Sequence, residues 1–160
     1  MKLSPTTAAN LATGAAEFVK KKFGFDLPYT PESLIVVDAI IDKIKATVAS
    51  EQQATGLLSG LGCYAGEVFV RHARASWRWT TEMKMAAACR FLIVIALPDI
   101  SACDVIGSVF QRFSGGTTEG VTRLYELAVA PRANDRASKA TPDLEATRSR
   151  ANGSGERSDR

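Results

Sequence analysis

The sequence predicts an α+β domain with N-terminal helices, a small antiparallel sheet (a hairpin) and two C-terminal helices. Apolar residues repeat at helical spacing over 5–23, 31–48 and 51–72. A period-two alternation at 76–80 and a β-branched, aromatic and aliphatic run at 88–97 predict two strands. Strands and helices do not alternate along the chain, which argues against a nucleotide-binding α/β fold.

The first helix is predicted to begin at Ser4, which can cap a helix whose first position is Pro5, and to end at Gly24. Three lysines, 20–22, fall in its last turn, where cations offset the partial negative charge of a helix end. We expect a solvated helix end here. The alternative is a patch that binds an anionic partner.

The second helix is predicted by Thr30 followed by Pro31, a pair typical of a helix start. Asp38 and Asp42 lie four residues apart, opposite the apolar face of this helix. Such carboxylates are usually the solvated side of an amphipathic helix. We therefore expect them to be exposed rather than to hold a metal ion.

The third helix, 51–72, contains four glycines within an apolar pattern. Each glycine costs about 1 kcal/mol relative to alanine in a helix interior. We expect the second helix or the sheet to approach the bare backbone closely and so offset this cost. The alternative is a break or a ligand-facing surface near Gly62.

In the predicted hairpin, Trp77 and Trp79 share one face of the first strand and Arg78 lies on the other. We expect both tryptophans to face the core. The second strand is closed by Pro98, and the residues between the strands suit a longish loop.

Two helices complete the predicted domain. Ser101 and Asp104 resemble a capping pair for a helix that ends at 115–116. The last helix is expected to start at Thr117 or Thr118.

Residues 1–130 are predicted to form a single domain, and residues 131–160 a disordered polar tail. The tail holds seven of the 20 basic and five of the 17 acidic residues, no aromatic residue and one large aliphatic residue, Leu144. The preceding part has 13 basic and 12 acidic residues, a formal charge of +1. This balance indicates neither a nucleic acid nor a membrane as partner.

The start of the chain lacks the basic and then unbroken apolar pattern of an export signal. The most apolar run, 91–97, is far shorter than the roughly 20 residues that span a bilayer. Cys63, Cys89 and Cys103 are odd in number and widely spaced, which argues against disulfides and a zinc site. We expect a soluble, cytoplasmic protein with reduced thiols and no cofactor.

The sequence leans against an enzyme. His72 is its one histidine, and Arg71 and Arg74 beside it favour the neutral imidazole. No serine or cysteine lies in a nucleophile-elbow or papain-type context, and no glycine-rich loop has the pattern of a phosphate cradle.

The segment 64–67 offers the sharpest candidate site. A partly buried Glu67 needs a partner, either Arg71, an arginine of the strand, or the indole of Trp77. The favoured interpretation is a structural polar anchor. The alternative is a small cleft between the third helix and the hairpin, lined by Tyr64, Glu67, Arg71 and Trp77.

The Tyr64-x-Gly66-Glu67 segment is followed ten residues later by Trp77 and preceded by a helix start at 31–34. In these features the chain resembles a group of small uncharacterised bacterial domains, over about residues 27–125. The resemblance implies a fold and a bacterial source, and it carries over no catalytic residue. The sequence departs from the group at 75–76, where a glycine-containing turn is usual.

Three functions follow as hypotheses. The leading one is a non-enzymatic domain that binds a protein partner, in an immunity-like or adaptor role. The second is a small-ligand binder or hydrolase that uses a Glu67/Tyr64 cleft. The third, binding of single-stranded nucleic acid through 71–79, ranks last because the tryptophans are expected to face the core.

Overall fold

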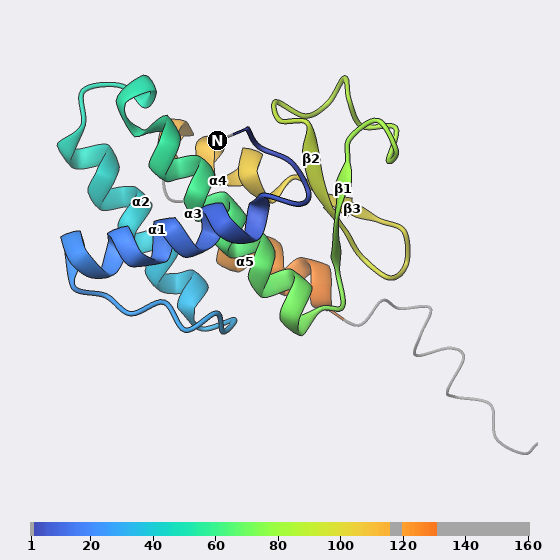
Figure 1. The fold of residues 1–160 in the computed structure, drawn as a ribbon, viewed down its shortest axis with the longest axis horizontal. Helices are drawn as coiled ribbons and strands as arrows, with labels where there is room; N and C mark the ends of the chain where they lie inside the picture. The colour runs from blue at the N-terminus through green and yellow to red at the C-terminus, as the bar shows by residue number, and fades with distance from the viewer. Residues whose placement is uncertain (1, 116–119, 131–160) are drawn as a thin grey trace, which may run out of the picture. The chain divides into compact units, whose positions relative to one another are not determined.

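The elements follow the predicted order, and the α+β class is confirmed (Figure 1). The structure, a computed structural model, describes residues 2–115 and 120–130. The predicted tail, 131–160, lies outside these residues. In chain order the described elements are α1 (Ala8–Phe23), α2 (Ser33–Thr47), α3 (Glu51–His72), β1 (Ser76–Trp79), β2 (Ile93–Ala96), β3 (Ala102–Cys103), α4 (Val105–Gly115) and α5 (Val121–Val129).

The sheet is antiparallel in the order β1-β2-β3, with Trp77 opposite Ile95 and Ile95 opposite Cys103. All four residues of the central strand β2 are buried, whereas β1 alternates exposed and half-buried residues. Both tryptophans of β1 pack against the core, as predicted. Burial of an entire strand gives the sheet its apolar centre.

The second strand is shorter than the predicted 88–97, and the third strand was not predicted. The chain turns before β2, because Met85 accepts backbone hydrogen bonds from Ala88 (2.9 Å) and Cys89 (3.1 Å). An apolar run alone does not distinguish such turns from a strand. Strand β3 has two residues, too few to leave a periodic signal.

Helix α3 runs unbroken from Glu51 to His72, as predicted, with α1 alongside it (Figure 1). Its glycines let neighbours approach the backbone, and of the two predicted neighbours, α2 or the sheet, it is the sheet that approaches a glycine, together with α1 and α4. A Cβ at Gly60 would lie 2.8 Å from the Cβ of Ala15 in α1, and one at Gly62 would lie 2.8 Å from the Cα of Ile106 in α4. At Gly66 a Cβ would overlap the indole of Trp77, so the predicted approach by the sheet is confirmed. Gly62 therefore faces a packed helix and not a ligand.

The helix ends show three differences from the predicted capping. Helix α1 begins only at Ala8, after a turn in which the carbonyl of Ser4 accepts from residues 7 and 8. Helix α2 begins at Ser33, since Thr30 accepts its N–H in a preceding turn (3.0 Å). Asp104 caps α4 by accepting the N–H of Gly107 (2.8 Å), and the N–H of Ser101 donates to Asp99 Oδ1 (3.0 Å).

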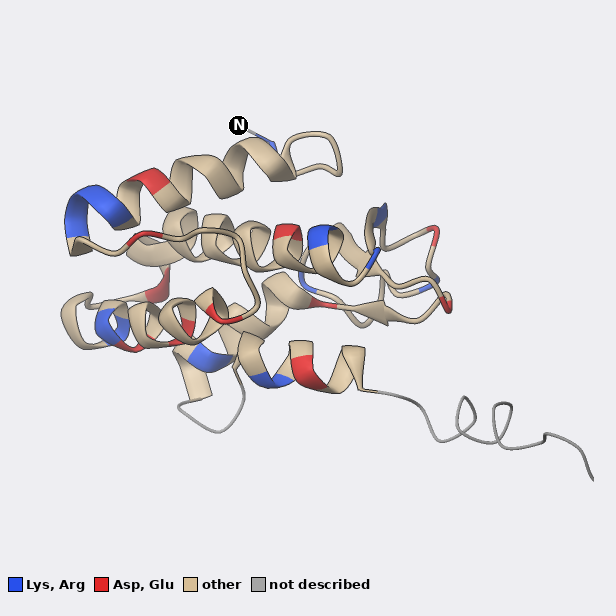
Figure 2. Cartoon of the chain, turned by 90° about the horizontal axis from the view of Figure 1, so that it is seen from below, with Lys and Arg blue, Asp and Glu red and all other residues tan. Residues whose placement is uncertain are grey.

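The end of α1 agrees with the sequence analysis. Gly24 has φ 75° and donates to the carbonyl of Lys20, the left-handed helix stop that was predicted. Lys20, Lys21 and Lys22 are exposed, and Lys20 forms an ion pair with Asp26 (2.8 Å). Figure 2 shows these lysines together at the end of the helix.

The predicted start of the last helix, at 117 or 118, lies outside the described residues, which show α5 from Val121. In the part of the chain that the structure describes, no helix is long and apolar enough to cross a membrane.

Two glycines of α3 provide a matched test of the packing. A Cβ at Gly56 meets no atom within 4 Å, so Gly56→Ala should raise the free energy of unfolding by about 1 kcal/mol through helix propensity. Gly62→Ala should lower it by about 1–3 kcal/mol, because the Cβ is forced against the backbone of α4. Urea denaturation of both variants measures the difference. Equal effects at the two positions would contradict the packing described.

Candidate functional site

Tyr64 of α3 is fully buried, and its hydroxyl forms hydrogen bonds with the segment before α2 and with the first residue of α2. The N–H of Tyr29 donates to the Tyr64 hydroxyl oxygen (2.8 Å). Ser33 donates its hydroxyl to the carbonyl of Thr30 (2.5 Å), so the Tyr64 hydroxyl donates to Ser33 Oγ (2.7 Å). The hydroxyl hydrogens of both Ser33 and Tyr64 are therefore already donated within the protein. Tyr64 is therefore built into the core, with no face open to a ligand.

Glu67 is also buried, with 8% of the residue exposed. Of the three predicted partners, it is the indole of Trp77 that bonds to it. Trp77 Nε1 donates to Glu67 Oε1 (2.9 Å). The same indole lies on the bare backbone of Gly66. Gly66 and Glu67 thus hold the first strand of the sheet against α3 through one contact surface and one charge-assisted hydrogen bond.

Arg71 contacts neither Tyr64 nor Glu67 by a recorded hydrogen bond or ion pair among the described residues. Its guanidinium lies over the ring of Tyr29, 3.8 Å from the centroid, and the Tyr29 and Tyr64 rings are 4.5 Å apart. The exposed His72 donates from Nε2 to the carbonyl oxygen of Tyr29 (2.8 Å), a second contact between the end of α3 and the segment before α2.

The four residues predicted to line a cleft thus divide into two separate sets of contacts, Glu67 with Trp77, and Tyr64 and the exposed Arg71 with Tyr29. Both groups join elements of the fold. This arrangement is the structural anchor favoured for Glu67 in the sequence analysis.

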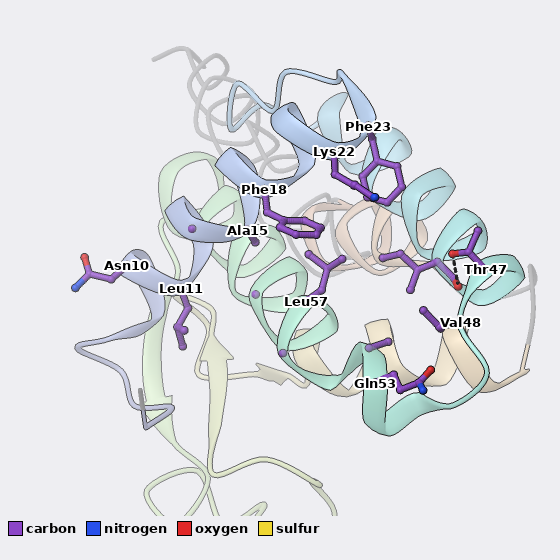
Figure 3. A pocket seen from close by; sticks show the side chains of 15 residues that line it. Asn10, Leu11, Ala15, Phe18, Lys22, Phe23, Thr47, Val48, Gln53 and Leu57 are labelled. Atoms are coloured by element: carbon purple, nitrogen blue, oxygen red, sulfur yellow. Dashed lines mark hydrogen bonds between the residues drawn. The ribbon is translucent and has the colours of Figure 1, made fainter.

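An open pocket lies elsewhere, between α1, the end of α2 and the first half of α3 (Figure 3). We call it the α1–α3 pocket. Its volume is about 610 Å³, within the range of small-molecule sites. Its lining residues are Asn10, Leu11, Gly14, Ala15, Phe18, Lys22, Phe23, Ile44, Thr47, Val48, Gln53, Ala54, Gly56, Leu57 and Gly60.

The walls of the α1–α3 pocket are apolar, and its polar groups are few. Phe18 and Leu57 face each other across the middle, with Lys22 and Phe23 at one end and Gln53 at the other (Figure 3). Phe18 is 47% exposed, so much of its ring is open to a ligand in the pocket. Lys22 is the one ionisable residue among the 15 that line the pocket.

Two glycines in these walls have no packing reason to be glycine. A Cβ built at Gly14 or at Gly56 meets no atom within 4 Å, and both residues lie inside helices. Gly60, by contrast, is required by the contact of α3 with Ala15. The spacing of the glycines in α3 does not show which of them face open space, so the sequence predicts close packing for all four alike.

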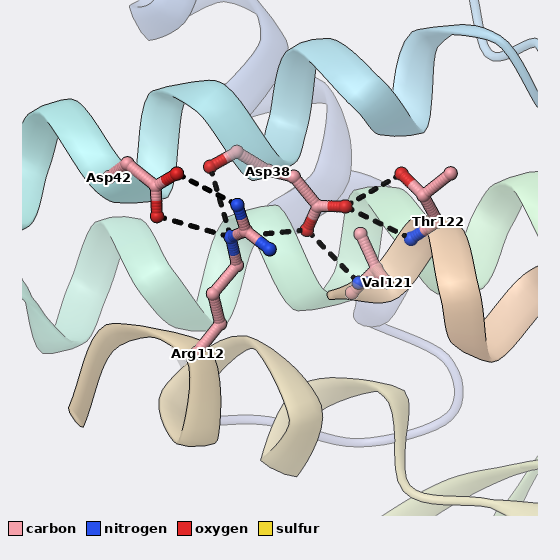
Figure 4. A network of polar contacts seen from close by, with 5 residues as sticks. All are labelled: Asp38, Asp42, Arg112, Val121 and Thr122. Atoms are coloured by element: carbon pink, nitrogen blue, oxygen red, sulfur yellow. Dashed lines mark hydrogen bonds and ion pairs between the residues drawn. The ribbon is translucent and has the colours of Figure 1, made fainter. Parts of the chain in front are cut away.

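Asp38 and Asp42 belong to an ionic network in which Asp38 is buried and the side chain of Asp42 is 38% exposed, so the predicted exposure was wrong for Asp38 (Figure 4). Arg112 of α4 donates to both carboxylate oxygens of Asp42 (3.2 and 2.7 Å) and lies 3.6 Å from Asp38 Oδ1. The carboxylate of Asp38 accepts the N–H groups of Val121 (3.0 Å) and Thr122 (3.2 Å) at the start of α5.

The Asp38 carboxylate is thus an N-cap supplied from another helix. Sequence patterns do not reveal such a partner, because Arg112 lies 70 residues from Asp42 along the chain. The network joins α2, α4 and α5, and every carboxylate in it has a protein partner.

No metal site is formed by three or more His, Cys, Asp or Glu side chains within the described residues. Cys63 is fully buried beside Tyr64. Burial, and secondarily the nearby Glu67, raises the pKa of the Cys63 thiol from 9.0 to about 12. Burial also raises the pKa of Tyr64.

These shifts predict a loss of stability at high pH. An unfolded Cys63 ionises near pH 9, whereas the folded thiol keeps its proton until about pH 12. The free energy of unfolding should therefore fall as pH rises above 9, by about 1.4 kcal/mol per pH unit for this group. Urea denaturation between pH 8 and 10 should show a shallower decline for Cys63→Ala. An identical decline in both proteins would contradict the burial of the thiol.

Comparisons of the chain with protein-family models, with curated proteins and with solved structures found no match. The resemblance to the group of bacterial domains stays a prediction.

Proposed function

We propose that this chain is a non-enzymatic binding protein that takes the apolar part of a small ligand into the α1–α3 pocket. Apolar walls with few polar groups are typical of small-molecule sites. Acid–base or nucleophilic catalysis needs several placed polar groups, and the lining offers Lys22 with the amides of Asn10 and Gln53 and the hydroxyl of Thr47. This composition favours binding over chemistry.

The proposal rests on the open space next to two glycines of the pocket walls, Gly14 and Gly56. Each costs about 1 kcal/mol relative to alanine, and no close neighbour offsets it. Alanine would be tolerated by the fold at both positions, so the packing of the protein does not account for glycine there. Preservation of open space for a ligand does account for it.

Gly56→Leu tests the proposal by placing a side chain in the pocket. N-phenyl-1-naphthylamine, an uncharged fluorescent probe, should bind the wild-type protein and be displaced by dodecanol. Gly56→Leu should weaken binding of the probe about tenfold or more, since the new side chain occupies its space. Gln52→Leu, at an exposed position of the same helix outside the lining, is the matched control and should bind as the wild type does.

Circular dichroism establishes that both variants fold. A folded Gly56→Leu with unchanged affinity for the probe would refute the proposal. Absence of probe binding by the wild-type protein would refute it as well.

A protein partner, in the immunity-like or adaptor role, is a second candidate, favoured by Ile100. This residue lies in the turn between β2 and β3, is 86% exposed and has φ 60°. A left-handed conformation costs a β-branched residue roughly 1–2 kcal/mol, and glycine is usual at this place in such a turn. A large apolar side chain at the exposed tip, despite this cost, supports contact with another protein.

Ile100→Gly separates the effect of backbone strain on stability from the effect of the apolar side chain on binding. It should raise the free energy of unfolding by about 1–2 kcal/mol by removing the strain, while weakening any complex that uses the turn. Ile35→Ala, at a 62% exposed apolar position of α2, is the control. A partner that co-purifies equally with the wild type, Ile35→Ala and Ile100→Gly would exclude the turn as its binding surface.

A further inference from the structure

We infer that the α1–α3 pocket selects a free anionic amphiphile, with the head group at Lys22 and the alkyl chain between Phe18 and Leu57. This inference rests on the proposed function and names the class of ligand. An anionic ligand at Lys22 agrees with the alternative predicted from the sequence for the lysines 20–22, a patch that binds an anionic partner.

The shape of the pocket separates a polar end from an apolar middle. Lys22 lies beside Phe23 at one end, and Phe18 and Leu57 lie between that end and Gln53 (Figure 3). An extended chain with its head at Lys22 would therefore cover the exposed ring of Phe18. Burial of apolar surface drives such binding.

Of the three other polar side chains in the lining, Asn10, Thr47 and Gln53, two already hold hydrogen bonds within the protein. The Thr47 hydroxyl donates to the carbonyls of Lys43 (3.0 Å) and Ile44 (3.1 Å). Gln53 Oε1 accepts the N–H of Ala49 (3.3 Å). A sugar or a nucleotide needs several directional hydrogen bonds, so this lining suits a ligand with one polar end.

The charged residues around the pocket indicate that the polar end of the ligand is an anion. Lys22 forms no recorded ion pair with a described residue, and no acidic residue lines the pocket. The last turns of α1 and α2 carry the lysines 20–22 and Lys45, which outweigh in formal charge the partial negative charges of the two helix ends. Asp26 pairs with Lys20, and Lys22 is the one cation among the residues that line the pocket.

Three ligands with the same chain and different heads test the inference: dodecanoate, dodecanol and dodecyltrimethylammonium, the two ions below their micelle concentrations and dodecanol below its solubility limit. Competition with N-phenyl-1-naphthylamine measures their affinities for the full chain. Dodecanoate should bind about fivefold more tightly than dodecanol, and dodecyltrimethylammonium more weakly than both, because the contact is an exposed ionic one. The preference for dodecanoate should shrink as salt is added.

Lys22→Met should remove this preference and leave the affinity for dodecanol unchanged, since the methionine keeps the apolar stem. Lys21→Met, in the same turn but outside the lining, is the matched control and should keep the preference. Equal loss in both variants would overturn the placement of the head group at Lys22.

The outcomes separate this inference from the proposed function. Equal binding of dodecanoate and dodecanol, both weakened by Gly56→Leu, would overturn the anionic head group and leave the pocket as the binding site. Binding of none of the ligands would overturn both. Sedimentation with phosphatidylglycerol vesicles that depends on Lys22 would overturn the free amphiphile in favour of a membrane surface.

Discussion

Close contact between the backbone of α3 and its neighbours is the constraint on which the rest of the structure depends. Gly60 admits α1, Gly62 admits α4, and Gly66 admits the indole of Trp77, through which the sheet is attached. Three different elements therefore reach the same helix at distances that a side chain would prevent. The polar contacts of Tyr64 and Glu67 lie on this helix between and beside those glycines, and they fix the segment before α2 and the strand β1 in place.

The same helix uses glycine in a second way. At Gly56 the missing side chain admits no neighbour and instead widens the space below α1, where Gly14 does the same from the opposite wall. Helix α3 thus has a densely packed second half and an open first half. A ligand site next to a rigid packed region can be held open without the movement of surrounding elements.

The sequence predicts the fold well where the signal is local and repeats along the chain. The bounds of α3, the shared face of Trp77 and Trp79, and the left-handed stop at Gly24 all depend on neighbouring residues, and all are confirmed. Features that depend on distant residues are missed. The exposure predicted for Asp38 was wrong because its partners are on α4 and α5, and the pocket was not predicted because open space between helices has no pattern in the sequence.

The capping of α5 by Asp38 has a consequence for the order in which the chain acquires its structure. Helix α5 has nine residues, and a helix of this length is marginal in isolation. Its first N–H groups are satisfied by a carboxylate 83 residues earlier, so α5 becomes stable only after α2 has docked. During synthesis it is the last described element to emerge. Its Val121 and Tyr125, the latter packed edge-on against Phe69, complete the core on this side.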